Sequence, residues 1–157
     1  MAKTDPVGAR RRARFYSLAV KEVAPLTADS VEVTFDVPPE LGPEFDYLPG
    51  QFVALRTHLG GRELRRSYSL CRSPQAGSIS VAIKKDHGGV FSTWANTELR
   101  VGDQIEVMSP EGTFTTDMSA LAGKHFAAVA AGSGITPIIS LARSVLNWAH
   151  DTSFTLV

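Results

Sequence analysis

The sequence has only one cysteine, Cys71, among its 157 residues. One thiol cannot form a disulfide within the chain, and an iron–sulfur cluster normally takes four thiolates, so this chain is not expected to hold a [2Fe–2S] centre. The absence of paired cysteines fits a reducing cytoplasm. The histidines are isolated and lack metal-ligand spacing, so we also expect no metal site.

Long apolar runs and an excess of one charge are missing as well. No stretch of about 18 apolar residues occurs, and the N-terminus lacks the apolar segment of a secretory signal. The 16 basic and 16 acidic residues give a net charge of zero, so no global field attracts the chain to nucleic acid or an anionic membrane. We therefore expect a cytoplasmic protein without nucleic-acid or membrane partners.

Basic residues do gather near the N-terminus, at Arg10, Arg11, Arg12 and Arg14. This stretch has no apolar periodicity, which predicts a solvated, disordered tail over residues 1–13. A docking patch is the alternative interpretation.

The region from 14 to 118 has mostly alternating apolar and polar residues, which predicts half-buried strands. The alternating apolar positions are Tyr16, Leu18 and Val20; Val31, Val33, Phe35 and Val37; Ile79, Val81 and Ile83; and Ile105 and Val107. Glycine and proline turn signals separate these runs. About six short strands at this spacing predict an all-β, six-stranded antiparallel barrel, with one short helix over residues 90–99.

The pattern changes after residue 119. Residues 126–131 form a nearly continuous apolar run, typical of a strand covered on both faces. A glycine-rich turn follows, and Thr136 and Pro137 are expected to cap and open a helix. The apolar stripe expected on that helix is Ile138, Ile139, Ala142, Val145, Leu146 and Ala149. With another apolar strand from residue 153, residues 119–157 are interpreted as the first βαβ unit of an α/β nucleotide-binding domain that is cut short.

The first chemical motif is Arg66-Ser67-Tyr68-Ser69, on an expected strand. Arg66 and Tyr68 are two residues apart, so their side chains leave the same face. A guanidinium can bind a pyrophosphate through paired hydrogen bonds, and a phenol ring can stack on a flat ring system. A barrel strand with a surface arginine and a cross-strand tyrosine is the plain alternative.

The second motif is Gly88-Gly89-Val90-Phe91-Ser92, which opens the expected short helix. Glycines allow close approach of an anion, and the free N–H groups of a helix start favour negative charge. Ser92 could add a hydroxyl donor. A glycine turn before an ordinary helix is the alternative.

The third motif is Gly132-Ser133-Gly134-Ile135-Thr136-Pro137, between strand and helix. Glycines at such a turn form dinucleotide phosphate sites, although the spacing is not the full Rossmann fingerprint. A tight turn without a ligand is the alternative.

In this order and spacing, the three motifs resemble those of the ferredoxin–NADP reductase superfamily, over residues 15–157. In that superfamily an R-x-Y-S/T strand binds the flavin, a G-x-x-S helix start binds the FAD pyrophosphate, and a G-x-G-x-x-P turn binds the nicotinamide nucleotide. Residues 49–52 (PGQF) and 110–114 (PEGTF) match further family segments. Residues 63–73 and 130–137 are similar to one branch, the reductases of bacterial oxygenases that carry a C-terminal [2Fe–2S] domain.

The resemblance implies a role for each residue of the motifs. Tyr68 would stack on the isoalloxazine, Ser69 and Thr136 would act at the flavin–nicotinamide junction as the catalytic residues, and Arg66 would pair with the pyrophosphate. The implied cofactor-binding residues are Arg66, Ser67, Tyr68, Ser69, Ile83, Lys84, Gly88, Gly89, Val90, Phe91, Ser92, Gly132, Gly134, Thr136 and Pro137. Lys84 has an alternative interpretation as part of a solvated hairpin end, and Cys71 is interpreted as a buried small hydrophobe.

The resemblance also implies an activity. Hydride would pass from NAD(P)H to FAD, and electrons would pass on to an iron–sulfur protein or oxygenase component, in a system of the phenylacetate-degradation kind. Because the α/β domain is expected to be incomplete, so is its NAD(P)H site. The alternative is a non-catalytic FAD-binding module that needs a partner or a missing C-terminal part.

Overall fold

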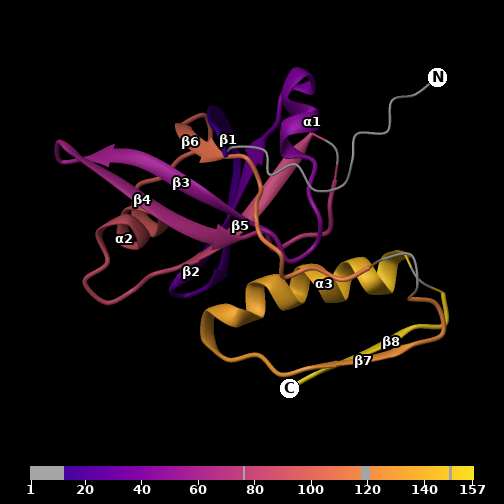
Figure 1. The fold of residues 1–157 in the computed structure, drawn as a ribbon. Coiled ribbons are helices and arrows are strands. Elements are labelled where there is room, and N and C mark those ends of the chain that lie inside the picture. The colour runs from indigo at the N-terminus through magenta and orange to yellow at the C-terminus, as the bar shows by residue number, and fades with distance from the viewer. Residues whose placement is uncertain (1–12, 76, 118–120, 149) are drawn as a thin grey trace, which may run out of the picture.

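The computed structural model describes residues 13–75, 77–117, 121–148 and 150–157 (Figure 1). Almost all of the predicted N-terminal tail lies outside the described residues. So do the predicted domain boundary between residues 118 and 119 and the last position of the expected helical stripe, Ala149.

Six strands form one antiparallel sheet, in the order β4-β3-β6-β1-β2-β5. They are β1 (Phe15–Thr27), β2 (Ser30–Asp36), β3 (Phe52–Leu59), β4 (Arg62–Ser69), β5 (Ser78–Lys84) and β6 (Gln104–Met108). The strands predicted from alternating apolar residues are therefore confirmed. The first half of β1 pairs with β6 and the second half with β2, so β1 passes from one part of the sheet to the other.

The predicted barrel is a bent sheet whose hydrogen-bond ladder does not close. Its edge strands β4 and β5 meet only just beyond Ser69, where Leu70 and Val81 form an isolated bridge. Beside it, the N–H of Cys71 donates to the carbonyl of Ser80 at 3.0 Å. Because the two edges touch at one point, the bent sheet encloses a core without a continuous ring of strands. Its strands therefore alternate between core-facing and outward-facing residues as barrel strands do, which explains why the sequence pattern resembled a barrel.

The core lies inside this bent sheet and is completed by short helices. Fully buried side chains from several strands meet there, including Val33, Phe35, Val53, Leu55, Val81, Ile83 and Val107. Three further elements lie beside them: a 3₁₀ turn (Pro39–Leu41), α1 (Gly42–Phe45) and α2 (Val90–Thr97). Phe45, Phe91 and Ala95 join the core from these segments, and Leu99 joins it from just beyond α2. The predicted short helix is thus confirmed, ending at Thr97.

The two further segments that match the family, residues 49–52 and 110–114, pair with each other. The N–H of Phe52 donates to the carbonyl of Glu111 at 2.8 Å, and the reverse bond is 2.9 Å long. Gly50 has φ +93°, and a Cβ there would lie 1.9 Å from the carbonyl oxygen of Phe114. Only glycine permits this approach, so the PGQF and PEGTF segments are parts of one structural unit beside β4.

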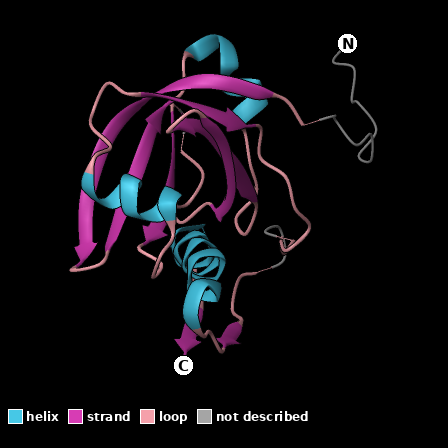
Figure 2. Cartoon of the chain, turned by 90° about the vertical axis from the view of Figure 1, so that its left-hand side faces the viewer, coloured by secondary structure: helices cyan, strands magenta, loops and turns pink. Residues whose placement is uncertain are grey.

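The C-terminal part consists of β7 (His125–Ala128), a 3₁₀ turn (Gly132–Gly134), α3 (Ile135–Trp148) and β8 (Ser153–Leu156). β7 and β8 pair in parallel, which confirms the βαβ arrangement. The view in Figure 2 places α3 between the six-stranded sheet and the β7–β8 pair. The first strand is shorter than residues 126–131, because residues 129–131 belong to the turn that leads into α3.

Two expectations about α3 need correction. The helix begins at Ile135, so Thr136 is inside its first turn and is not the N-cap. Its buried face also differs from the apolar stripe: Leu146 is half exposed, whereas Ser140 and Ser144 are fully buried. The small side chain of Ser140 lets the helix lie close to the segment after β4, and its hydroxyl bonds to the carbonyl of Arg72 there, whereas the hydroxyl of Ser144 bonds within the helix.

Candidate functional site

The flavin motif lies on β4, an edge strand of the sheet. Arg66 pairs with Leu55 of β3, and Tyr68 pairs with Val53. Alternation along the strand puts Arg66 and Tyr68 on the same face, as predicted. Ser67 follows Arg66, pairs with Ala54, is exposed, and belongs to the opposite face.

Tyr68 is half-buried between the core and α2. Its ring centroid lies 5.9 Å from that of Phe91, with the ring planes 33° apart. Phe91 in turn contacts Trp94 edge-on at 5.7 Å. Burial raises the pKa of Tyr68 to about 12, so its phenol is neutral at physiological pH. The contact connects the strand motif to the helix-start motif.

Arg66 and its neighbour Arg65 have different surroundings. Arg65 extends its guanidinium over the ring of Phe15, 5.0 Å from the centroid, and donates to Sδ of Met108 at 3.3 Å. Arg66 is exposed and donates from Nη1 to the carbonyl of Arg65 at 2.8 Å. A guanidinium has five N–H donors, so this bond leaves Arg66 with donors for an anionic ligand.

The Gly88–Ser92 segment forms a tight loop before α2. Gly88 has φ +74°, a region that favours glycine. A Cβ at Gly89 would lie 2.5 Å from Oγ of Ser92 and 3.0 Å from Cβ of Asp86. The N–H of Asp86 donates to Oγ of Ser92 at 3.0 Å. Ser92 is only 3% exposed, so its hydroxyl stabilises the loop rather than facing a ligand.

The N-terminus of α2 opens onto a groove. Its first backbone N–H groups, including those of Val90 and Phe91, have no partner within the helix. The groove has a volume of about 490 Å³ and is lined by Leu59, Gly60, Gly88, Gly89, Val90, Thr93, Trp94 and Glu98. It therefore lies between the β3–β4 hairpin tip and the start of α2, a place suited to a phosphate-containing ligand.

The remaining predicted residues of the β region have varied surroundings. Ser69 is half-buried and ends β4 opposite Phe52. Ile83 is fully buried in the core, so its side chain is part of the packing. The ammonium of Lys84 is exposed and lies 3.5 Å from a carboxylate oxygen of Asp29, which suits a solvated hairpin end.

The third motif lies at the start of α3. Gly132 has φ +58°, and Gly132 and Gly134 are exposed in the 3₁₀ turn. The hydroxyl of Thr136 donates to the carbonyl of Ser133 at 2.6 Å, and Pro137 follows in the first helical turn. Proline is tolerated there because it removes an N–H that has no helical acceptor.

Sequence reasoning missed residues that become important only through folding. Leu59, Gly60 and Trp94 line the groove, and Trp94 could have been noticed from its helical spacing to Val90 and Phe91. Ser140 and Arg143 of α3 bond to the segment that follows β4, and no sequence signal indicated this. Cys71 is buried as expected, and burial raises its pKa to about 12.

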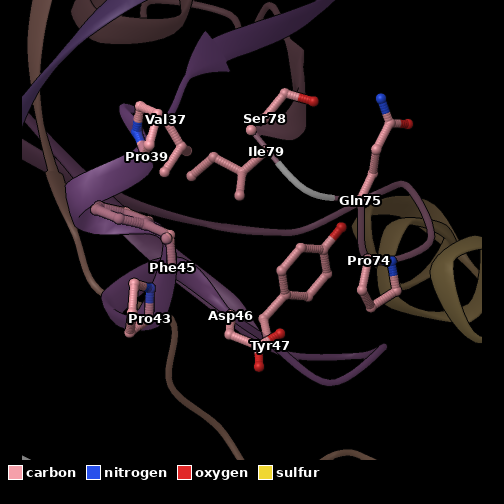
Figure 3. A pocket seen from close by; sticks show the side chains of 12 residues that line it. Val37, Pro39, Pro43, Phe45, Asp46, Tyr47, Pro74, Gln75, Ser78 and Ile79 are labelled. Atoms are coloured by element: carbon pink, nitrogen blue, oxygen red, sulfur yellow. The ribbon is translucent and has the colours of Figure 1, made fainter.

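A larger cavity of about 790 Å³ lies elsewhere, between the α1 region and the residues before β5 (Figure 3). Phe45, Tyr47 and Pro74 are among the side chains around it. None of the predicted site residues lines it, so we assign the candidate site to the smaller groove. Within the described parts of the chain, no three His, Cys, Asp or Glu side chains cluster as metal ligands, and no helix is long and apolar enough to cross a membrane.

Comparison with known proteins agrees with this geometry. The family model of oxidoreductase FAD-binding domains matches residues 17–116. One component of the 1,2-phenylacetyl-CoA epoxidase from Escherichia coli (strain K12) is 42% identical over 143 residues, which are 91% of this chain and 40% of that protein. The ferredoxin reductase component of 3-ketosteroid-9-alpha-monooxygenase from Rhodococcus rhodochrous is 37% identical, over 82% of this chain and 36% of that protein.

Comparison with solved structures agrees with the sequence comparisons. Phthalate dioxygenase reductase, described as a modular structure for electron transfer from pyridine nucleotides to [2Fe–2S], superposes with a TM-score of 0.70 at 26% identity. The match covers 90% of this chain and 44% of that one. The chain spans about 40% of the length of its curated relatives. It belongs to the oxidoreductase FAD-binding domain family, within the ferredoxin–NADP reductase superfamily.

Proposed function

We propose that this chain binds FAD between β4 and the start of α2, as part of an NAD(P)H-dependent electron-transfer flavoprotein. The contact between Tyr68 and Phe91 is the observation that carries the proposal, because it joins the two predicted flavin motifs into one site. Arg66 and the N–H groups of Val90 and Phe91 are the kind of donors that a pyrophosphate needs. The donor set therefore fits FAD.

Each element of the site has a proposed task. Arg66 and the helix start hold the pyrophosphate, with Gly88 and Gly89 giving the backbone room to approach it. The neutral ring of Tyr68 supports the flavin face, and Ser69 lies at the end of the same strand near the reacting edge. Ser92 supports the loop through Asp86, and Ile83 supports the strand from inside the core.

The α/β part would contribute the nicotinamide nucleotide side. Gly132 and Gly134 open the turn, and Thr136 and Pro137 begin α3 behind it. When bound, FAD supplies the redox chemistry, accepting a hydride and releasing single electrons. We assign residues 14–118 to the FAD-binding domain and 119–157 to the first βαβ of the nucleotide-binding domain.

The proposed electron acceptor is an iron–sulfur protein or domain of an oxygenase system. This part rests on the relatives, which include an epoxidase component and a monooxygenase reductase component. A role like that of the epoxidase component, in phenylacetate breakdown in the cytoplasm, is the finer form of the proposal. The second candidate is an FAD-binding module that does not react with NAD(P)H alone. The α/β part favours this candidate. Its described residues contain two paired strands, whereas a doubly wound nucleotide-binding sheet normally has several.

Absorbance spectroscopy of the purified 157-residue chain, reconstituted with FAD, tests the proposal. We expect flavin bands that remain after gel filtration. Anaerobic bleaching by stoichiometric NADH or NADPH identifies the oxidoreductase, and retained colour without bleaching identifies the module. A folded protein that retains no flavin contradicts both.

A further inference from the structure

Helix α3 is joined to the segment that directly follows the flavin strand. The hydroxyl of Ser140 donates to the carbonyl of Arg72 at 2.7 Å. Ser140 is fully buried, so this polar contact is shielded from water. A buried hydroxyl with a good acceptor restricts how the helix can slide or rotate on the sheet.

The place of this bond in the chain relates it to the proposed site. Arg72 is three residues beyond Ser69, and Ser140 is four residues beyond Thr136, about one helical turn. One hydrogen bond thus connects the end of the flavin strand to the first turns of the helix behind the nucleotide motif. It is a short path between Ser69 and Thr136, the two residues expected at the flavin–nicotinamide junction.

The acceptor side of the bond is held firmly by the sheet. The carbonyl of Arg72 also accepts from the hydroxyl of Tyr47 at 3.0 Å, and the Arg72 guanidinium pairs with the buried carboxylate of Glu32. Next to it, the N–H of Cys71 bonds to Ser80. Because these contacts come from the α1–β3 segment, β2 and β5, Arg72 is a fixed point against which α3 is placed.

A second contact comes from the same helix. Nη1 of Arg143 donates to the carbonyl of Cys71 at 3.1 Å, but the residue is exposed and its side chain is long and flexible. Ser144, one turn after Ser140, is equally buried, yet its hydroxyl donates to the carbonyl of Ser140 within the helix. Ser140 is therefore the buried side chain of α3 that bonds across to the Arg72 carbonyl.

We propose that Ser140 is a positioning residue that sets the location of the nucleotide turn, Gly132 to Pro137, relative to the flavin strand. The inference rests on the proposed function, since it assumes that FAD lies along β4. Hydride transfer requires reacting atoms about 3–3.5 Å apart, so a small displacement of this turn would matter. A short, buried serine holds the helix more tightly than a flexible surface side chain can.

A distance measurement in the FAD-loaded 157-residue chain tests this role without relying on turnover. A spin label is attached at the exposed position Asn147 of α3, through Asn147→Cys in a Cys71→Ala background. Pulsed electron paramagnetic resonance then measures the distance from the spin label to the radical of the photoreduced flavin. We expect a single narrow distribution for this parent and, for Ser140→Ala, a distribution about twofold wider or displaced by about 1–2 Å.

Two matched variants separate positioning from general damage to packing. Ser144→Ala removes an equally buried hydroxyl without touching the sheet, and Tyr47→Phe removes the other donor to Arg72 without touching α3. Both are expected to keep the parent distribution, and FAD affinity is expected to stay within about twofold in all three variants, because none lies at the pyrophosphate site. Equal distributions in Ser140→Ala and Ser144→Ala would overturn the inference alone. A parent that binds no FAD would overturn the proposed function as well.

Discussion

The ring of Phe91, at the start of α2, supports the ring of Tyr68 on β4, with 5.9 Å between their centroids. This contact makes one site from two motifs that lie apart in the chain, on either side of β5. In the proposed FAD site, Phe91 would contribute through this contact, which fixes the strand and the helix start relative to each other.

Replacement of Phe91 by leucine should therefore weaken both stability and FAD binding. We expect a loss of about 1–2 kcal/mol in the free energy of unfolding, because Phe91 is 2% exposed and its ring contacts are removed. FAD affinity should fall as Tyr68 loses its support. Phe45→Leu is the matched control, since Phe45 is also buried and contacts Tyr16 at 5.6 Å away from the site. Urea unfolding and flavin fluorescence titration distinguish the two effects, and an equal loss of FAD affinity in both variants would contradict this role.

Arg66→Ala should weaken FAD binding by roughly 1.5–3 kcal/mol, through loss of a charge-assisted pair with the pyrophosphate. Stability should change little, because Arg66 is exposed. Lys21→Ala removes an equal charge from another part of the surface and should leave FAD affinity unchanged. Flavin fluorescence titration at two salt concentrations measures both. Unchanged affinity in Arg66→Ala would remove this residue from the site.

The two glycines before α2 should respond differently to alanine. Gly88→Ala has open space around the new methyl group but forces alanine to φ +74°, a cost of about 1 kcal/mol. Gly89→Ala adds a methyl group 2.5 Å from Oγ of Ser92 and 3.0 Å from Cβ of Asp86 and should cost more, about 1–3 kcal/mol. The double variant Gly89→Ala/Ser92→Ala should recover part of this loss in thermal unfolding. A milder effect of Gly89→Ala than of Gly88→Ala would show that the loop is arranged differently.

Stability should fall as the pH rises above about 9. Burial raises the pKa of Cys71 from its ordinary value of 9.0 to about 12, and it raises the pKa of Tyr68 from 10.0 to about 12. Burial also raises the pKa of Tyr47. In each case the folded protein holds a proton that the unfolded chain has lost, so unfolding becomes more favourable with increasing pH.

Urea unfolding between pH 8 and pH 11 measures this dependence. Cys71→Ala should remove the part of the decline that begins near pH 9, the ordinary pKa of the thiol, and leave the part that begins near pH 10, the ordinary pKa of the tyrosines. Identical pH profiles for the wild type and Cys71→Ala would be evidence against a protonated, buried thiol.

The ion pair between Glu32 and Arg72 should be asymmetric. Glu32 is 5% exposed, whereas the Arg72 side chain is 52% exposed. Arg72→Met leaves a buried carboxylate without its cation and should cost about 1–3 kcal/mol, a range that allows for screening by water. Glu32→Gln keeps a hydrogen-bond acceptor and should cost less.

A double-mutant cycle with chemical unfolding measures the coupling between the two residues. Combining Glu32→Gln with Arg72→Met should cost less than the sum of the single variants, because no buried charge is left. The exposed pair Lys21–Asp36, with 3.9 Å between its charged atoms, is the control and should show little coupling. Strict additivity for Glu32 and Arg72 would contradict the buried pairing.

Much of the fold followed from short-range pattern. Alternation in 31–37 and 79–83 predicted β2 and β5, and the glycines before Val90 predicted the start of α2. The six antiparallel strands of the predicted barrel were confirmed, but their hydrogen-bond ladder does not close, because closure depends on how edge strands β4 and β5 approach, and they meet only at Leu70 and Val81. Thr136 as N-cap was wrong because α3 follows directly on the 3₁₀ turn Gly132–Gly134 and begins at Ile135, two residues before the expected first helical residue, Pro137.

The sequence alone was sufficient for the family, the strands, the α2 helix and the placement of Arg66 and Tyr68 on one face. These depend on local periodicity and on residues only a few positions apart. Tertiary structure decided that Ser92 supports Asp86, that Phe91 supports Tyr68, and that Ser140 bonds to Arg72. The last two contacts join residues 23 and 68 positions apart, and strand register and helix packing, which no local pattern contains, determine which groups meet there.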